Sequence, residues 1–135
     1  MTDTSRRLRE PPLSPHLQVW RWHVTMLTSI LHRASGVALY VGALVLAAWA
    51  MSLAAGPEAY GTFKAALGSF PGKVVLFAMT AAVFYHLANG VRHLVWDAGH
   101  GLDIKTADVT AYFVIGFAAV ATLAFWIAAA MMGAL

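Results

Sequence analysis

Three long apolar stretches dominate the chain, and each is long enough to cross a lipid bilayer as a helix. They cover approximately residues 30–55, 74–96 and 109–133. A membrane-spanning helix needs about 20 apolar residues, because each residue adds about 1.5 Å along the helix axis. Residues that favour turns separate the stretches: Gly56-Pro57, Pro71-Gly72 and Asp97-Ala98-Gly99. We predict an all-α membrane protein with three transmembrane helices, forming one domain over residues 1–135.

Composition supports lipid as the solvent for most of the chain. Of its 135 residues, 60% are hydrophobic and 11% are charged, and the mean hydropathy is +0.68. A soluble domain of this size would expose large apolar patches to water. The chain has no cysteine, which excludes disulfides and thiolate metal sites. Its nine lysines and arginines form no basic stripe, so no nucleic-acid partner is expected.

Positive charges are distributed unevenly across the predicted membrane. Seven arginines and lysines belong to the N-terminal tail, the entrance of the first helix, and the second loop with its border: Arg6, Arg7, Arg9, Arg21, Arg33, Arg92 and Lys105. The first loop has only Lys64 and Lys73. The positive-inside rule therefore predicts that the tail (residues 1–28) and the second loop are cytoplasmic and that the C-terminus lies on the opposite side. Asp108 is the expected N-cap of the third helix. The N-terminal sequence resembles neither a signal nor a transit peptide, which favours a bacterial inner membrane.

Two polar clusters interrupt the apolar helices. One contains Ser29, His32, Arg33 and Ser35-Gly36, and the other contains His86, Gly90, Arg92, His93 and Asp97. Ionisable side chains within a membrane span are costly, so each is a candidate for function. If the first two helices are neighbours, both clusters lie in the cytoplasmic leaflet. His86 lies about 15 Å deeper than Trp96 along the helix axis, near the middle of the bilayer.

The spacing of the second cluster indicates a haem site. At 100° per residue, His86, Gly90, His93 and Asp97 share one face of a helix. Gly90 leaves a gap in which a broad planar group can lie, and histidine is a common axial ligand of haem iron. His93 lies on the same side of the same helix as His86, so it cannot be the opposite axial ligand. It is better placed near a propionate, with His32 or Arg33. The second axial ligand is expected from a partner protein.

Simpler interpretations apply to each residue alone. His86 could hydrogen-bond a neighbouring helix, and Gly90 could be a small-residue packing contact. Arg33 and Arg92 could extend toward the membrane surface, and Asp97 could pair with a neighbour or end its helix. The combined arrangement favours haem binding.

The residues around these clusters resemble the cytochrome b subunit of succinate dehydrogenase, the larger membrane anchor of respiratory complex II. Three segments carry the resemblance, namely residues 12–17 (PLSPHL), 29–36 (SILHRASG) and 86–97 (HLANGVRHLVWD). The third segment is highly specific, and the resemblance covers nearly the whole chain. One departure is Pro11, where the family usually has an arginine, and this concerns docking of the tail to the hydrophilic subunits.

The resemblance implies a role for each matching position. His86 matches the axial ligand of haem b, and His32, Arg33 and His93 match positions near the haem propionates. The positions matching the ubiquinone site are Ser29, Ile30, Arg33 and, near the quinone and its proton supply, Asp97. The implied partners are a flavoprotein subunit, an iron–sulfur subunit and a second membrane anchor that shares the haem. The implied function is transfer of electrons from the iron–sulfur subunit to ubiquinone.

Three other functions fit parts of the pattern. A purely structural anchor would bind no cofactor, although the shared face of His86 and Gly90 argues against it. A fumarate reductase anchor would use menaquinone and run the same chemistry in reverse. A small transporter would use the intramembrane charges, but three helices without an inverted repeat do not favour it.

Overall fold

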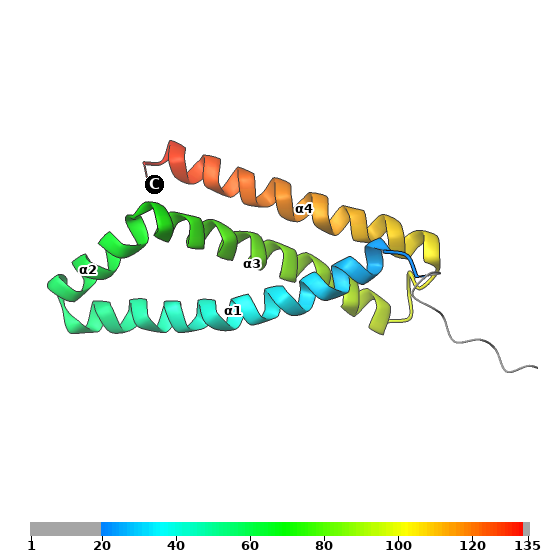
Figure 1. The fold of residues 1–135 in the computed structure, drawn as a ribbon, viewed down its shortest axis with the longest axis horizontal. Coiled ribbons are helices and arrows are strands. Elements are labelled where there is room, and N and C mark those ends of the chain that lie inside the picture. Colours follow the sequence, from blue (N-terminus) through cyan, green and yellow to red (C-terminus); the bar gives the residue numbers. More distant parts are fainter. Residues whose placement is uncertain (1–19, 134–135) are drawn as a thin grey trace, which may run out of the picture.

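A computed structural model describes residues 20–133 as four helices (Figure 1). They are α1 (Val24–Ala55), α2 (Pro57–Gly68), α3 (Phe70–Asp97) and α4 (Ile104–Met131). By length and composition, α1, α3 and α4 can each cross a membrane. The predicted all-α fold with three transmembrane helices is therefore confirmed. Residues 1–19 and 134–135, including the segment 12–17, Pro11, Arg6, Arg7 and Arg9, lie outside the described part.

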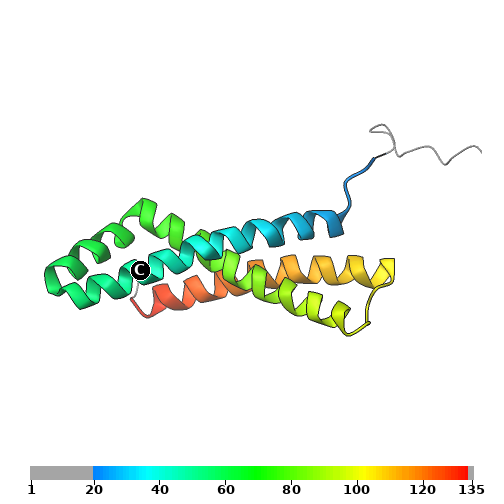
Figure 2. The same ribbon diagram turned by 90° about the horizontal axis from the view of Figure 1, so that it is seen from below.

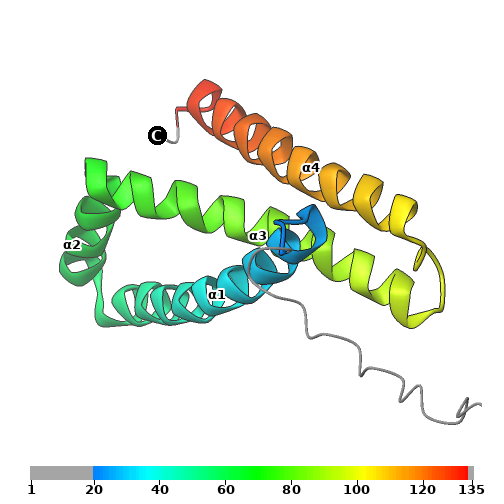
Figure 3. The same ribbon diagram turned by 45° about the vertical axis from the view of Figure 1, so that its right-hand side comes forward.

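The central helix of the bundle is α3, which packs against both α1 and α4 (Figure 1). Figure 2 shows that α3 is inclined to α1, and Figure 3 shows α2 linking the end of α1 to the start of α3. The start of α1 and the α3–α4 connection lie at one end of the bundle, whereas α2 and the end of α4 lie at the other (Figure 1). This arrangement brings the first third of α1 beside the second half of α3.

The first helix begins earlier than the sequence indicated. It starts at Val24 instead of near residue 30, so residues 24–28 of the expected tail are helical. The apolar pattern marks the length that matches the bilayer, and a helix can continue beyond it where polar side chains find partners. Thr28 Oγ1 donates a hydrogen bond to the Thr25 carbonyl over 3.0 Å, so its hydroxyl is satisfied within the helix.

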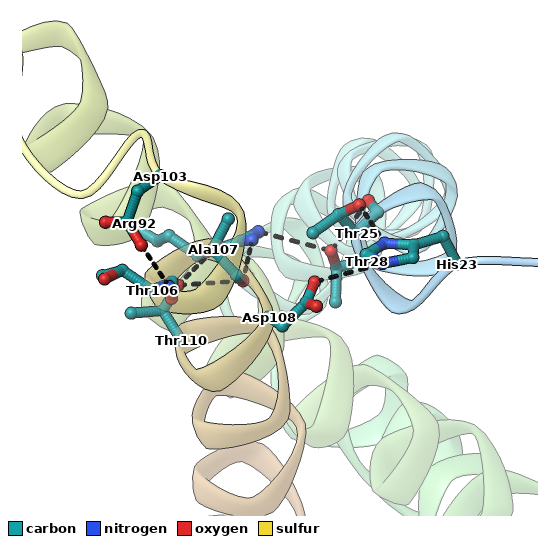
Figure 4. Close-up of polar contacts among 9 residues, drawn as sticks. All are labelled: His23, Thr25, Thr28, Arg92, Asp103, Thr106, Ala107, Asp108 and Thr110. Carbon is teal, nitrogen blue, oxygen red and sulfur yellow. Dashed lines mark hydrogen bonds and ion pairs between the residues drawn. The ribbon is translucent and has the colours of Figure 1, made fainter.

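The predicted N-cap of the last helix was wrong. The cap is Asp103, whose Oδ1 accepts a hydrogen bond from the Thr106 amide over 2.9 Å, and α4 begins at Ile104. Asp108 instead lies in the second turn of α4, with its Oδ1 3.4 Å from Nε2 of His23 (Figure 4). Thus Asp108 joins α4 to the residue before α1 and does not begin a helix.

The first loop contains a helix that the sequence analysis did not predict. Pro57 occupies the first turn of α2, where its missing amide costs no hydrogen bond, and Glu58 favours the same turn electrostatically. The segment lacks a long apolar pattern, and none of its residues is buried. Ser69 then caps α3, because its Oγ accepts a hydrogen bond from the Gly72 amide over 3.3 Å.

Candidate functional site

The second half of α3 has two polar faces that serve different purposes. Tyr85, Asn89 and Arg92 are buried and face the interior of the bundle. At 100° per residue, the face of His86, Gly90, His93 and Asp97 is turned by roughly a right angle from them. The predicted site face therefore borders the bundle interior and faces α1 on one side.

Arg92 is a buried clamp that joins all three long helices (Figure 4). Only 6% of this residue is exposed. Its guanidinium donates to Thr28 Oγ1 on α1 over 3.3 Å, and to Thr110 Oγ1 and the Ala107 carbonyl on α4 over 3.0 and 2.7 Å. The sequence allowed two interpretations of Arg92, one in which it extends toward the membrane surface and one in which it has a function within the membrane. The structure places it within the bundle as a packing element.

Two neighbours on the same face complete this polar interior. The Tyr85 hydroxyl donates to the Thr28 carbonyl over 2.7 Å, and Asn89 Oδ1 accepts from Arg92 over 3.3 Å. The Trp96 ring lies 4.0 Å from the Arg92 guanidinium carbon, close enough for a cation–π contact. This face was not predicted from the sequence, although the spacing of residues 85, 89 and 92 has the same helical period as the histidine face.

Three histidines gather between α1 and α3. The His32 ring is stacked on His86 with a centroid distance of 4.1 Å and on His93 with a distance of 4.8 Å. The structure therefore brings together the two clusters that the sequence analysis placed side by side. His93 Nδ1 lies 2.8 Å from the Asn89 carbonyl, and this contact orients its ring along α3.

The His86 ring rests on α1. Its Nδ1 lies 3.1 Å from Ser35 Oγ, and a Cβ atom added at Gly36 would lie 3.3 Å from its Cε1. A Cβ atom added at Gly90 would meet nothing within 4 Å, so space remains open beside His86 on its own helix. His32 Nδ1 is buried without a hydrogen-bond partner within residues 20–133. The region combines a half-buried imidazole, open space and an unsatisfied polar atom.

The stacked histidines cannot together hold one metal ion. The lone pair of an imidazole nitrogen lies in the plane of its ring, and the His32 and His86 planes differ by only 11°. Face-to-face rings therefore do not direct their nitrogens at a common atom between them. Consistently, residues 20–133 contain no group of three or more His, Cys, Asp or Glu arranged to hold a metal ion. Of these histidines, His86 is the one beside both Ser35 and the open space.

Of the four residues expected at the quinone, three are exposed and Ser29 is partly buried. Ser29 and Arg33 are one turn apart on α1, next to His32, and Arg33 is exposed. Ile30 is 49% exposed, and Asp97 is the exposed last residue of α3. Within the described residues, no side-chain hydrogen bond or ion pair joins these four to one another. They are available to a ligand or to another protein.

Comparisons with known proteins agree with this architecture. The family model described as "Succinate dehydrogenase/Fumarate reductase transmembrane subunit" matches residues 7–125. The chain is 36% identical to the succinate dehydrogenase cytochrome b556 subunit of Rickettsia felis, over 94% of this chain and 100% of the relative. It is 39% identical to the corresponding subunit of Paracoccus denitrificans, over 79% and 81%. The cytochrome b560 subunit of Reclinomonas americana is 34% identical over 86% and 84%. The chain therefore belongs to the family of succinate dehydrogenase and fumarate reductase transmembrane subunits.

Proposed function

We propose that this chain binds haem b and ubiquinone as the larger membrane anchor of a succinate:quinone oxidoreductase. The observation that carries the proposal is the His86 imidazole, held against α1 by Ser35 with open space beside Gly90. Membership of the family supports the anchor role, and the relatives named above are cytochrome b subunits.

The residues around His86 fit a haem. His86 would ligate the haem iron, Gly90 would let the porphyrin approach α3, and His32, Arg33 and His93 would lie near the propionates. The unsatisfied Nδ1 of His32 offers a hydrogen-bonding group for a propionate oxygen. Because the stacked rings of His32 and His86 do not direct their nitrogens at a common atom, we expect a second anchor subunit to supply the other ligand of the haem iron. When bound, the haem supplies a one-electron store close to the quinone.

Ser29, Ile30, Arg33 and Asp97 form this chain's part of the ubiquinone site. Arg33 stabilises the negative charge that develops on a quinone oxygen as electrons arrive. Ser29 donates a hydrogen bond to the headgroup that strengthens with this charge, and Ile30 provides an apolar wall. Asp97, at the end of α3, lies near the route by which protons arrive. The exposure of Ile30, Arg33 and Asp97 fits a pocket that partner subunits complete.

The proposal includes the rest of the complex. A flavoprotein subunit oxidises succinate, and an iron–sulfur subunit passes the electrons to the membrane surface where this anchor holds the quinone. The bacterial relatives and the three apolar helices support a bacterial inner membrane as the location. The curated relatives named above are succinate dehydrogenase subunits, which favours succinate oxidation over fumarate reduction as the physiological direction.

The haem assignment is tested with a His86→Leu variant of the whole complex. We expect the reduced-minus-oxidised spectrum of the purified variant to lose its low-spin haem b signal, because leucine cannot ligate iron. His100→Leu, in the α3–α4 connection, is the control and is expected to keep the signal. A full haem b signal in the His86→Leu complex would refute the assignment.

The quinone assignment is tested with Arg33→Ala. We expect quinone reduction to fall on the order of 100-fold, as when a donor to a developing negative charge is removed. Succinate oxidation with an artificial acceptor should stay at the wild-type rate. Arg21→Ala, which removes another exposed arginine, should change neither activity. Equal losses in both assays for Arg33→Ala would show failed assembly and contradict a role in quinone binding.

A further inference from the structure

The hydrogen bonds around Ser35 determine which nitrogen of His86 carries the proton. Ser35 Oγ lies 2.9 Å from the His32 carbonyl and 3.1 Å from His86 Nδ1. A carbonyl only accepts, so the single hydroxyl proton of Ser35 is donated to His32. The same oxygen can then only accept from His86, and Nδ1 must be the protonated nitrogen. The Nε2 lone pair of His86 remains free.

The packing around Ser35 keeps this hydrogen bond in place. Ser35 is buried, and its bond to the His32 carbonyl holds the hydroxyl in one rotamer. Gly36 lets the ring approach, because any side chain there would begin 3.3 Å from the His86 Cε1. Ser35 and Gly36 therefore form the surface of α1 on which the His86 imidazole packs.

We propose that Ser35 is a positioning residue that fixes the tautomer and orientation of His86, and thereby sets the reduction potential of the bound haem. This inference rests on the proposed function. A hydrogen bond from the second ring nitrogen makes an imidazole a more basic ligand. A more basic ligand favours ferric over ferrous iron, so the bond to Ser35 lowers the reduction potential.

The test compares two buried serines of α1 that have the same local hydrogen bond. Ser52 Oγ donates to the Trp49 carbonyl over 2.7 Å, as Ser35 does to the His32 carbonyl, but within the described residues its side chain forms no hydrogen bond with a histidine. Ser52→Ala therefore controls for the general effect of removing a buried serine from this helix. Ser35→Thr retains the hydroxyl, and threonine readily bonds the carbonyl one turn earlier.

The readouts are the midpoint potential of haem b and its low-spin electron paramagnetic resonance spectrum in the purified complex. We expect Ser35→Ala to retain haem with a raised midpoint potential and altered g values. Ser35→Thr and Ser52→Ala should match the wild type. If Ser35→Ala fails to retain haem, Ser35→Cys is measured. Its thiol is a weaker acceptor, and a smaller shift in the same direction is expected.

Two outcomes separate this inference from the function on which it rests. A haem b signal that survives in His86→Leu overturns the haem assignment itself. If His86→Leu loses the signal but the Ser35→Ala potential and spectrum match the wild type, only the positioning role of Ser35 is overturned. Unchanged values in Ser35→Cys, where Ser35→Ala retains no haem, overturn it equally.

Discussion

At the scale of single residues, the polar side chains inside this bundle form two groups. One group holds the helices together through hydrogen bonds, and the other remains available to bind a ligand. The Arg92 guanidinium donates hydrogen bonds to oxygen atoms on α1, α3 and α4, so several acceptors share its charge. His86, His32 and His93 instead gather beside open space. The two groups are adjacent on α3 but face different directions. The hydrogen bonds of Arg92 hold α1 beside α3, and this packing brings the three histidines together.

Substitution of Arg92 should lower the stability of the anchor more than it lowers the rate of quinone reduction. Arg92→Ala leaves the oxygens of Thr28, Asn89 and Thr110 without their charged donor. Hydrogen bonds to charged groups contribute about 1.5–3 kcal/mol each, and such losses are not additive. We expect a loss of stability on the order of 3 kcal/mol, measured by thermal unfolding of the detergent-purified complex.

Arg92→Lys is the matched control, because it keeps the charge but not the branched set of donors. It should have intermediate stability. If both variants unfold at the wild-type temperature, the bonds of Arg92 do not hold the helices together.

The sequence predicted which histidines lie together better than it predicted the residues that contact them. His86, His32 and His93 were placed together because helix periodicity and an antiparallel arrangement are properties of sequence. The packing of His86 on Ser35 and Gly36 depends on how closely α3 approaches α1. Helix periodicity in the sequence does not specify that distance. The burial of Arg92 could not be predicted for the same reason, since an arginine near a helix end can also extend to the membrane surface.

At the scale of elements, the helices were predicted reliably where hydropathy determines them and less well at their ends. The three long helices follow directly from apolar length. The start of α4 at Ile104 depends on the cap formed by Asp103, whereas α1 begins at Val24 without a side-chain cap, among polar residues outside the membrane-spanning length. The helix α2 has no buried residue and no long apolar pattern, so it gave no comparable signal.

The start of α4 should be sensitive to acid. Hydrogen bonds from Thr106 lower the pKa of Asp103 below its usual value of 3.8. The carboxylate therefore stabilises α4 fully only at pH values well above 3.8, and this contribution is lost as the pH falls through the lowered pKa. We expect amide exchange at Thr106, corrected for its intrinsic pH dependence, to lose protection in that range.

Asp103→Asn provides the comparison, because asparagine still accepts a hydrogen bond at an N-cap but does not titrate. Its Thr106 amide should show no such acid-dependent loss. An identical acid response in the wild type and Asp103→Asn would mean that another group causes it.

At the scale of the whole molecule, the charge distribution indicates which end faces the cytoplasm. Burial of Arg92 removes it from the membrane surface, but six arginines and lysines still accompany the N-terminal end, against two, Lys64 and Lys73, at the α2 end. The positive-inside rule therefore still favours a cytoplasmic N-terminus and α3–α4 connection. This orientation would place the histidine group in the cytoplasmic leaflet.

The absence of cysteine from the sequence makes this orientation simple to test. Single cysteines replace Ala65 on α2 and His100 in the α3–α4 connection, both of which are exposed. A membrane-impermeant thiol reagent should label Ala65→Cys in intact spheroplasts, and His100→Cys only after the membrane is opened. The reverse pattern would require the opposite orientation.

The most direct test of the account is an experimental structure of the whole complex in lipid. We predict a haem whose iron is bonded to His86 Nε2, with the porphyrin edge passing Gly90 and with Ser35 still bonded to Nδ1 of the same ring. A second anchor should supply the opposite ligand. A His86 ring that contacts only lipid or protein, with the iron held elsewhere, would contradict the account.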